Sequence, residues 1–204
     1  MPDYQNRECG RLRQIQTSGR SVRVFFAIWP KDAVWRQLCG LSEKLELVCG
    51  GQRTRAESIH LTLIFLGEMG TSQLDALCLA ANTVKGRAFN FIVDGIRYWK
   101  FNRVVYAGAG EVPLELFNLV GSLKDALFAN GFSFDHRAFT PHITLVRKVQ
   151  PHVLPKSLKS LAEPIVWPVS EWILVKSEQV SDRSVYTPIG HWPLVSDSKI
   201  NTAF

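Results

Sequence analysis

Two short segments of the chain share a pattern of residue types that is suited to acid–base chemistry. SIHLTLIFLG at 58–67 and TPHITLVRK at 140–148 each contain His, an apolar residue, Thr and Leu in that order. The sequence has five histidines, and two of them, His60 and His142, open this pattern. Imidazole can give or take a proton near neutral pH, because its unperturbed pKa is about 6.5. The repeated tetrad therefore predicts a site that contains two histidines.

Strand geometry predicts how each tetrad presents its side chains. Successive side chains alternate between faces, so His60 shares a face with Thr62, and His142 shares one with Thr144. One such face can simply be the solvent side of a half-buried sheet. Two of them meeting across a groove would suit a phosphodiester: one His takes a proton from the attacking water and the other protonates the leaving oxygen. The hydroxyls would donate to phosphate oxygens, and we expect no metal or other cofactor.

The elements that must position the tetrads recur in the two halves of the chain. In each half a strand beginning with Arg-Val precedes a helix, and the helix precedes the tetrad. Outside the tetrads the two halves share little sequence, so we interpret the repeat as structural. The expected strands are 22–29, 59–67, 89–99, 103–110 and 140–148, with a closing hairpin of 171–179 and 184–194. The expected helices are 31–49, ended by Gly50-Gly51; about 72–85, with Thr71 or Ser72 as N-cap; and 113–130, closed at Gly131.

Composition limits the class of protein and its organisation. The chain is 46% hydrophobic and 21% charged, has a net charge of +6, and contains no apolar run long enough for a membrane helix. Its four cysteines form no C-x-x-C pair, which argues against a zinc site and against a disulfide framework. We expect one two-lobed domain over 21–195, a mobile extension at 1–20 and a tail at 196–204. A monomeric cytoplasmic protein that does not bind membranes is the expected form.

Three segments outside the tetrads also resemble segments of a known protein family. These are RVFFAIWP, RVVYAG and SEQVSDRSVYTPIGHWPL. From about Val22 to Leu194 the chain resembles the 2H phosphoesterase superfamily, and within it the RNA 2′,3′-cyclic phosphodiesterases, also called 2′-5′ RNA ligases. The resemblance implies a duplicated α+β fold, with antiparallel sheets of two lobes flanking a central groove and helices outside. It implies hydrolysis of a terminal 2′,3′-cyclic phosphate to a 2′-phosphate, and reversible 2′-5′ ligation when a 5′-hydroxyl replaces water. It also implies that His60 is the proton donor and His142 the proton acceptor.

Basic residues near the tetrads are candidates for phosphate binding. The resemblance favours an Arg after the second tetrad, and Arg147 matches. Arg147 lies on the strand parity opposite to His142, so it reaches the groove only past the sheet edge or across a bulge. Arg53 and Arg55 precede the first tetrad in QRTRAESIH, which lacks the Trp and Pro usual for the family. These two arginines either contact phosphate or belong to an exposed basic loop.

The substrate class stays open among related polyanions. Aromatic residues near the site can stack a nucleobase or pack in the core; they are Phe139, Tyr98, Trp99 and Phe101. RNA termini and small cyclic nucleotides are the expected partners. Alternatives are 2′-5′ oligoadenylates, ADP-ribose cyclic phosphate, or RNA binding without catalysis. The histidines outside the tetrads, His136, His152 and His191, are expected to be structural or surface residues.

Overall fold

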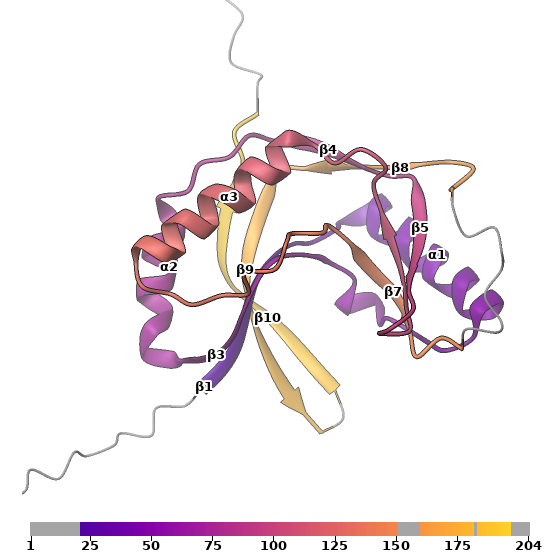
Figure 1. Cartoon of the computed structure of the whole chain (residues 1–204), viewed down its shortest axis with the longest axis horizontal. Coiled ribbons are helices and arrows are strands. Elements are labelled where there is room, and N and C mark those ends of the chain that lie inside the picture. Colours follow the sequence, from indigo (N-terminus) through magenta and orange to yellow (C-terminus); the bar gives the residue numbers. More distant parts are fainter. Residues whose placement is uncertain (1–20, 151–159, 182, 197–204) are drawn as a thin grey trace, which may run out of the picture.

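Most strands of the protein join a single antiparallel sheet (Figure 1). The computed structural model describes residues 21–150, 160–181 and 183–196. The α-helices of this part are α1 (Asp32–Cys49), α2 (Leu74–Asn82) and α3 (Leu114–Ala129), and short 3₁₀ turns cover Ala56–Ser58 and Thr71–Gln73. Its strands are β1 (Ser21–Ile28), β2 (Gln52–Arg53), β3 (Leu61–Gly70), β4 (Phe89–Val93), β5 (Gly95–Trp99), β6 (Val104–Gly108), β7 (Ile143–Arg147), β8 (Ile165–Val169), β9 (Glu171–Val180) and β10 (Arg183–Pro193).

The sheet consists of two halves that meet at the tetrad strands. Among the described residues the strand order is β10-β9-β1-β3-β7-β6-β5, and β2 pairs with β7. Strands β3 and β7 are joined through one residue pair, Leu61 with Ile143, whereas neighbours within each half pair over several residues. Because both tetrads lie at this junction, the duplicated halves place their functional side chains at the centre of the sheet. The α+β fold expected from the resemblance is confirmed.

The helices pack across the junction. Helix α1 follows β1 in the chain but packs against β7 of the other half, while α3 follows β6 and packs against β3 and α2. Figure 1 shows α2 and α3 beside β3, and α1 beside β7. Helices α1 and α3 therefore each stabilise the tetrad strand of the opposite half. This exchange ties the halves together where the strands themselves barely pair.

Strand β1 is buried on both faces, which is unusual for an antiparallel sheet. Val24 and Phe26 belong to the main core under the helices, and Phe25 and Ala27 form a smaller apolar cluster with Ile173 and others on the opposite face. Because both faces of this part of β1 are buried, its sequence VFFAI is continuously apolar and does not alternate with polar residues. The smaller cluster lies on the face that carries the tetrad histidines, so it limits solvent access to one of them.

Two of the expected elements were wrong in their boundaries. The expected strand 89–99 breaks at Asp94: β4 pairs with β8 in a separate two-stranded sheet, and β5 pairs with β6. The Gly110 N–H donates to the Asp94 carboxylate and the Leu161 N–H donates to its carbonyl, long-range bonds that the apolar pattern did not indicate. The second helix begins at Leu74 rather than after a Thr71 or Ser72 cap, because a 3₁₀ turn precedes it.

Other elements lie where the sequence predicted them, with small shifts. Helix α3 ends at Ala129, and Gly131 follows with a positive φ of 75°. Strand β8, with the sequence IVWPV, was not among the expected strands, and its proline is a residue that sheets rarely contain away from their edges. The expected extension at 1–20 and residues 197–204 of the expected tail lie outside the described residues, as does His152.

Candidate active site

The register of the two tetrad strands brings all four polar residues to one place. Leu61 lies opposite Ile143 in antiparallel pairing. Counting one residue either way sets His60 opposite Thr144 and Thr62 opposite His142, all on the same face. The aliphatic side chains of Leu61 and Ile143 are buried on the other face. The predicted meeting of two His/Thr faces is therefore present in the structure.

His60 is held by hydrogen bonds and by a group of aromatic rings. Its Nδ1 lies 2.8 Å from the Ser58 carbonyl oxygen, and its Nε2 lies 3.0 Å from the Thr62 hydroxyl. The imidazole stacks on Phe25 and on Trp29, with centroids 5.0 and 4.8 Å away, and meets the Tyr186 ring edge-on at 5.6 Å. These rings were not predicted from the sequence. Their one local sign is Phe25, an apolar residue on the face of β1 that contacts His60.

These contacts define the protonation state of His60. A carbonyl only accepts, so Nδ1 carries the hydrogen and donates it to Ser58; Nε2 then accepts from the Thr62 hydroxyl in the neutral ring. Burial is the largest cause that lowers the pKa of His60, the nearby charges of Arg147 and His142 also lower it, and the Ser58 hydrogen bond opposes them; together they bring the pKa to about 4. His60 is therefore neutral at pH 7 in the free protein, with its Nε2 lone pair toward Thr62.

This lowered pKa makes the stability of the fold depend on pH. Between pH 6.5 and about 4 the unfolded chain binds a proton at residue 60 that the folded chain excludes, so the free energy of unfolding falls as the pH falls through this window. We expect urea titrations at pH 7 and pH 4.5 to show that His60→Phe loses less stability on acidification than the wild type, by on the order of 1 kcal/mol. Phe keeps a ring against Trp29 but cannot titrate. Equal losses in the two proteins would contradict the buried neutral imidazole.

His142 has a related but different environment. Its Nδ1 lies 2.8 Å from the Thr140 carbonyl oxygen, so Nδ1–H donates there and Nε2 remains for the groove. The ring contacts Trp99 and Tyr106 edge-to-face, at centroid distances of 4.5 and 5.8 Å. Burial lowers the pKa of His142, the bond to Thr140 opposes this, and the charge of Arg147 adds to the lowering. Both histidines therefore use Nδ1 for positioning and leave Nε2 for chemistry.

A β-bulge in β7 turns the side chain of Arg147 to the face that carries His142. Val105 pairs with Val146 and Tyr106 with Thr144, so Leu145 is an extra residue in β7. Leu145 and Val146 are both buried, and the residue after them returns to the face of Thr144. Arg147 consequently faces the two histidines, and its charge lowers the pKa of both. Of the two routes that the sequence left open, the bulge is the one in the structure.

The turn after α1 braces this bulge. A Cβ at Gly51 would lie 2.5 Å from the Arg147 carbonyl oxygen, and Gly51 has a φ of 91°. Only glycine accepts both the close approach and this backbone conformation. β2 then pairs with the end of β7, Gln52 opposite Arg147. The Gly50-Gly51 pair therefore ends the helix and also positions Arg147.

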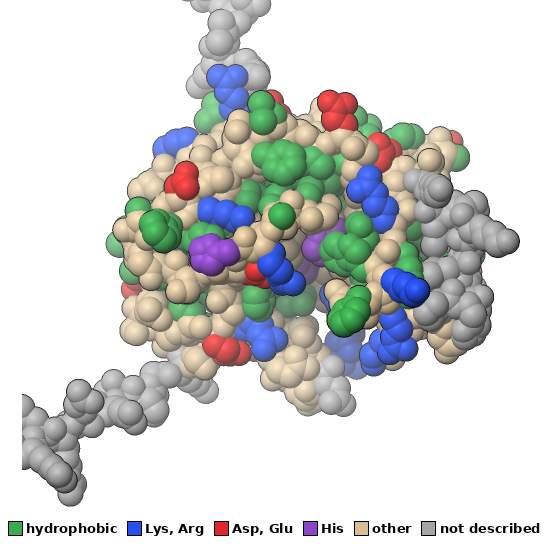
Figure 2. Space-filling view, in the orientation of Figure 1, with side chains coloured by type: hydrophobic (Ala, Val, Ile, Leu, Met, Phe, Trp, Pro, Cys, Tyr) green, Lys and Arg blue, Asp and Glu red, His purple; other side chains and the backbone are tan. Residues whose placement is uncertain are grey.

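Two cavities meet at the tetrads. A cleft of about 890 Å³ is bounded at one end by Thr62, His142, Thr144 and Arg147. A pocket of about 280 Å³ shares these four residues and adds His60 and the expected substrate contact Arg55. In Figure 2 a histidine lies in a hollow at the centre of this face, with hydrophobic and basic side chains beside it. The shared residues mark where a phosphate would be reached from both cavities.

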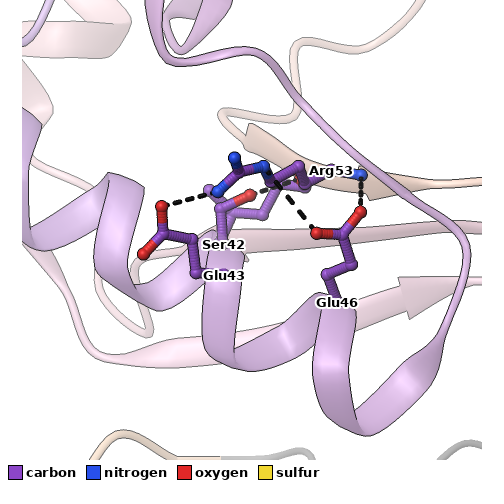
Figure 3. A network of polar contacts seen from close by, with 5 residues as sticks. Ser42, Glu43, Glu46 and Arg53 are labelled. Carbon is purple, nitrogen blue, oxygen red and sulfur yellow. Dashed lines mark hydrogen bonds and ion pairs between the residues drawn. The ribbon is translucent and has the colours of Figure 1, made fainter.

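The remaining candidates differ in their surroundings. Arg53 is held on α1: its Nη1 lies 2.5 Å from Glu43 Oε1 and its Nε lies 3.7 Å from Glu46 Oε2 (Figure 3). Arg53 and Arg55 are both exposed and both line the smaller pocket, but Arg53 is paired with these two carboxylates. Phe139 packs edge-on against Phe117, which is the packing alternative, and it also lines the larger cleft. His191 is exposed on β10, and His136 is exposed beside Phe134.

Within the described ranges, no three side chains of His, Cys, Asp or Glu come together in a way that could hold a metal ion. No helix of the described part is long and apolar enough to cross a membrane.

Comparison with known proteins agrees with the geometry. The family described as LigT like Phosphoesterase matches residues 28–106 and 108–186, so each match contains one tetrad. The chain is similar to the RNA 2′,3′-cyclic phosphodiesterase of Escherichia coli K12, with 31% identity over 84% of this chain and 96% of that protein. It is 31% identical to the enzyme of the same name from Thermotoga maritima, over 83% of this chain and 90% of that one. The crystal structure of E. coli LigT complexed with 3′-AMP superposes with a TM-score of 0.75 at 30% identity, covering 86% and 99% of the two chains. The doubled tetrad and the doubled match lead to one conclusion: this chain belongs to the LigT-like phosphoesterase family.

Proposed function

We propose that this protein hydrolyses the 2′,3′-cyclic phosphate at an RNA end to a 2′-phosphate. The observation that carries the proposal is the pair of imidazoles whose Nδ1 atoms are fixed by the Ser58 and Thr140 carbonyls, beside two hydroxyls and one arginine. The relatives named RNA 2′,3′-cyclic phosphodiesterase and the nucleotide complex of LigT support the same substrate chemistry.

In the proposed reaction the two histidines move protons at opposite ends of one phosphorus centre. Nε2 of His142 takes a proton from water, and the water oxygen bonds to phosphorus. The bond from phosphorus to the ribose 3′-oxygen breaks, and Nε2–H of His60 protonates that oxygen. Thr62, Thr144 and Arg147 hold the non-bridging oxygens, where negative charge is concentrated. With an RNA 5′-hydroxyl in place of water, the same displacement would join phosphorus to that 5′-oxygen, release the 3′-oxygen and leave a 2′-5′ link.

The acid must receive its proton when substrate binds. Burial keeps the pKa of both histidines low in the free protein, with His60 at about 4. A bound phosphodiester places a negative charge beside the imidazoles, and an opposite charge within about 4–6 Å favours the protonated ring. The assignment of His60 as acid and His142 as base follows the resemblance to the RNA 2′,3′-cyclic phosphodiesterases. Proton uptake during binding of a substrate analogue, measured in buffers of different ionisation enthalpy, would support this step.

The direct test is hydrolysis of adenosine 2′,3′-cyclic phosphate and of an oligonucleotide that ends in the cyclic phosphate, both in excess EDTA. We expect a 2′-phosphate from each, resolved by chromatography, and a bell-shaped dependence of kcat on pH, because kcat reports the enzyme with substrate bound. A 3′-phosphate product would show that the other oxygen leaves. Activity lost in EDTA and restored by a divalent ion would overturn the metal-independent mechanism. Turnover confined to 2′-5′ oligoadenylates or to ADP-ribose cyclic phosphate would make that compound the substrate in place of an RNA end.

We further propose that a single two-lobed domain over 21–195 acts as a monomer. Both histidines, both threonines and Arg147 come from one chain, so a second subunit is not needed to complete the site. Equal specific activity across a hundredfold range of enzyme concentration would support this. Activity that rises with enzyme concentration would contradict it.

A further inference from the structure

The larger cleft extends well beyond the residues that would hold the reacting phosphate. Its volume of about 890 Å³ is roughly three times the ~300 Å³ at the lower end of the range for small-ligand pockets. It begins at Thr62, His142 and Thr144 and runs to the turn between β5 and β6. A cyclic phosphate and its own ribose occupy only the inner end. The outer part of the cleft is thus space for more of the substrate.

The two tetrad strands differ in the residue that follows their bulge and faces this cleft. In β3, as in β7, two consecutive buried residues follow the Thr, because Leu63 is an extra residue between the pairs Thr62–Ala27 and Ile64–Phe26. The next residue is exposed in both copies: it is Arg147 in one half and Phe65, 44% exposed, in the other. The same bulge therefore delivers a cation on one side and an aromatic ring on the other. Both line the cleft.

The outer rim combines aromatic rings with positive charges. Trp99, Lys100 and Phe101 are consecutive at the end of β5, and Phe101 is 99% exposed, so packing does not account for its position. Lys124 and Arg137 also line the cleft, against one carboxylate, Asp135, which pairs with Arg137. Exposed rings interleaved with cations are the pattern by which proteins bind single-stranded nucleic acid, because bases stack on the rings while phosphates meet the cations.

We propose that the outer cleft binds the RNA strand on the 5′ side of the terminal nucleotide, with bases stacking on Phe65 and Phe101 and phosphates near Lys100. This inference rests on the proposed function and adds that the preferred substrate is an RNA end of at least two nucleotides. A mononucleotide reaches the histidines but leaves the rim empty. The rim therefore changes turnover only for the longer substrates.

The experiment compares adenosine 2′,3′-cyclic phosphate with di- and trinucleotides that end in the same cyclic phosphate. We expect kcat/KM of the wild type to be at least tenfold higher for the dinucleotide. Phe101→Ala should lower kcat/KM for the dinucleotide roughly tenfold and change it less than twofold for the mononucleotide. Phe128→Ala is the matched control, because Phe128 is 74% exposed on α3 and does not line the cleft. Lys100→Ala should lower the dinucleotide value and weaken its dependence on salt.

The outcomes separate this inference from the proposed function. Equal turnover of all three lengths by the wild type would overturn the strand site while leaving the cyclic phosphodiesterase intact. No turnover of any length would overturn both. A Phe101→Ala variant that loses both substrates equally, or that behaves like Phe128→Ala, would also overturn the strand site. Selective loss of the longer substrates would establish it.

Discussion

Replacing His142 or His60 by Ala is expected to lower kcat/KM for a terminal 2′,3′-cyclic phosphate roughly 10²–10⁴-fold in each case. The reason is that, in the proposed mechanism, each Nε2 handles one proton of the reaction, while each Nδ1 fixes its ring on a backbone carbonyl. The double variant should lose little more than the worse single variant, since groups that act as a unit are not additive. Steady-state rates with the cyclic mononucleotide measure this directly.

The residual activity of the two variants would assign the roles of the histidines. In a bell-shaped profile the base sets the acidic limb and the acid sets the alkaline limb. His60→Ala should therefore keep the acidic limb and lose the alkaline limb, and His142→Ala should do the reverse. The opposite result would exchange the assigned acid and base but retain the two-histidine mechanism. His191→Ala, which removes an exposed histidine on β10, is the control and should stay within twofold of the wild type.

Near-wild-type turnover in either tetrad variant would end the two-histidine mechanism. The folded state of the variants needs its own check, because His60 packs against Phe25 and Trp29. His60→Phe keeps an aromatic ring in that position and should be as inactive as His60→Ala. Circular dichroism at pH 7 would show that both variants retain the fold, so that a lost rate is a loss of chemistry.

Arg147→Gln is expected to lower kcat/KM roughly 10²-fold, which is the usual cost of removing one preorganised donor to a developing oxyanion. The bulge at Leu145 turns this side chain toward the histidines, into the pocket that it lines together with both of them. Arg147→Lys should restore part of the loss, because an ammonium keeps the charge but cannot bind two phosphate oxygens with a planar fork. Unchanged rates in Arg147→Gln would remove Arg147 from the site.

Removal of this charge also has a consequence that does not depend on activity. The positive charge of Arg147 lowers the pKa of His60 and of His142, so both values should rise in Arg147→Gln and stay low in Arg147→Lys. Titration of the imidazole Cε1–H resonances by NMR measures each value separately. Both limbs of the pH–rate profile should move to higher pH in Arg147→Gln. An unchanged pKa at either histidine would show that the Arg147 guanidinium does not face that ring.

The two-histidine chemistry proposed for the site follows from sequence alone. Two His-x-Thr-Leu tetrads on strands specify which side chains share a face, because side-chain direction in a strand follows a period of two whatever the tertiary structure. The same local logic predicted α1, α3 and most strands, since these elements depend on apolar spacing and on Gly and Pro at their ends. It failed at Asp94, where the break between β4 and β5 depends on hydrogen bonds to Gly110 and Gly108, far along the chain.

How the two tetrads meet, and which residues surround them, depends on long-range packing that the local sequence does not specify. The single pair of Leu61 with Ile143 sets the register of the site, and register is a property of two strands rather than of either one. The bulge at Leu145 reverses the parity expected for Arg147, and its counterpart at Leu63 brings Phe65 to the cleft. The aromatic rings that bury His60 come from β1 and β10, so no local pattern records them together. Burial and charge from distant segments are what shift a pKa, and these are known only once the chain is folded.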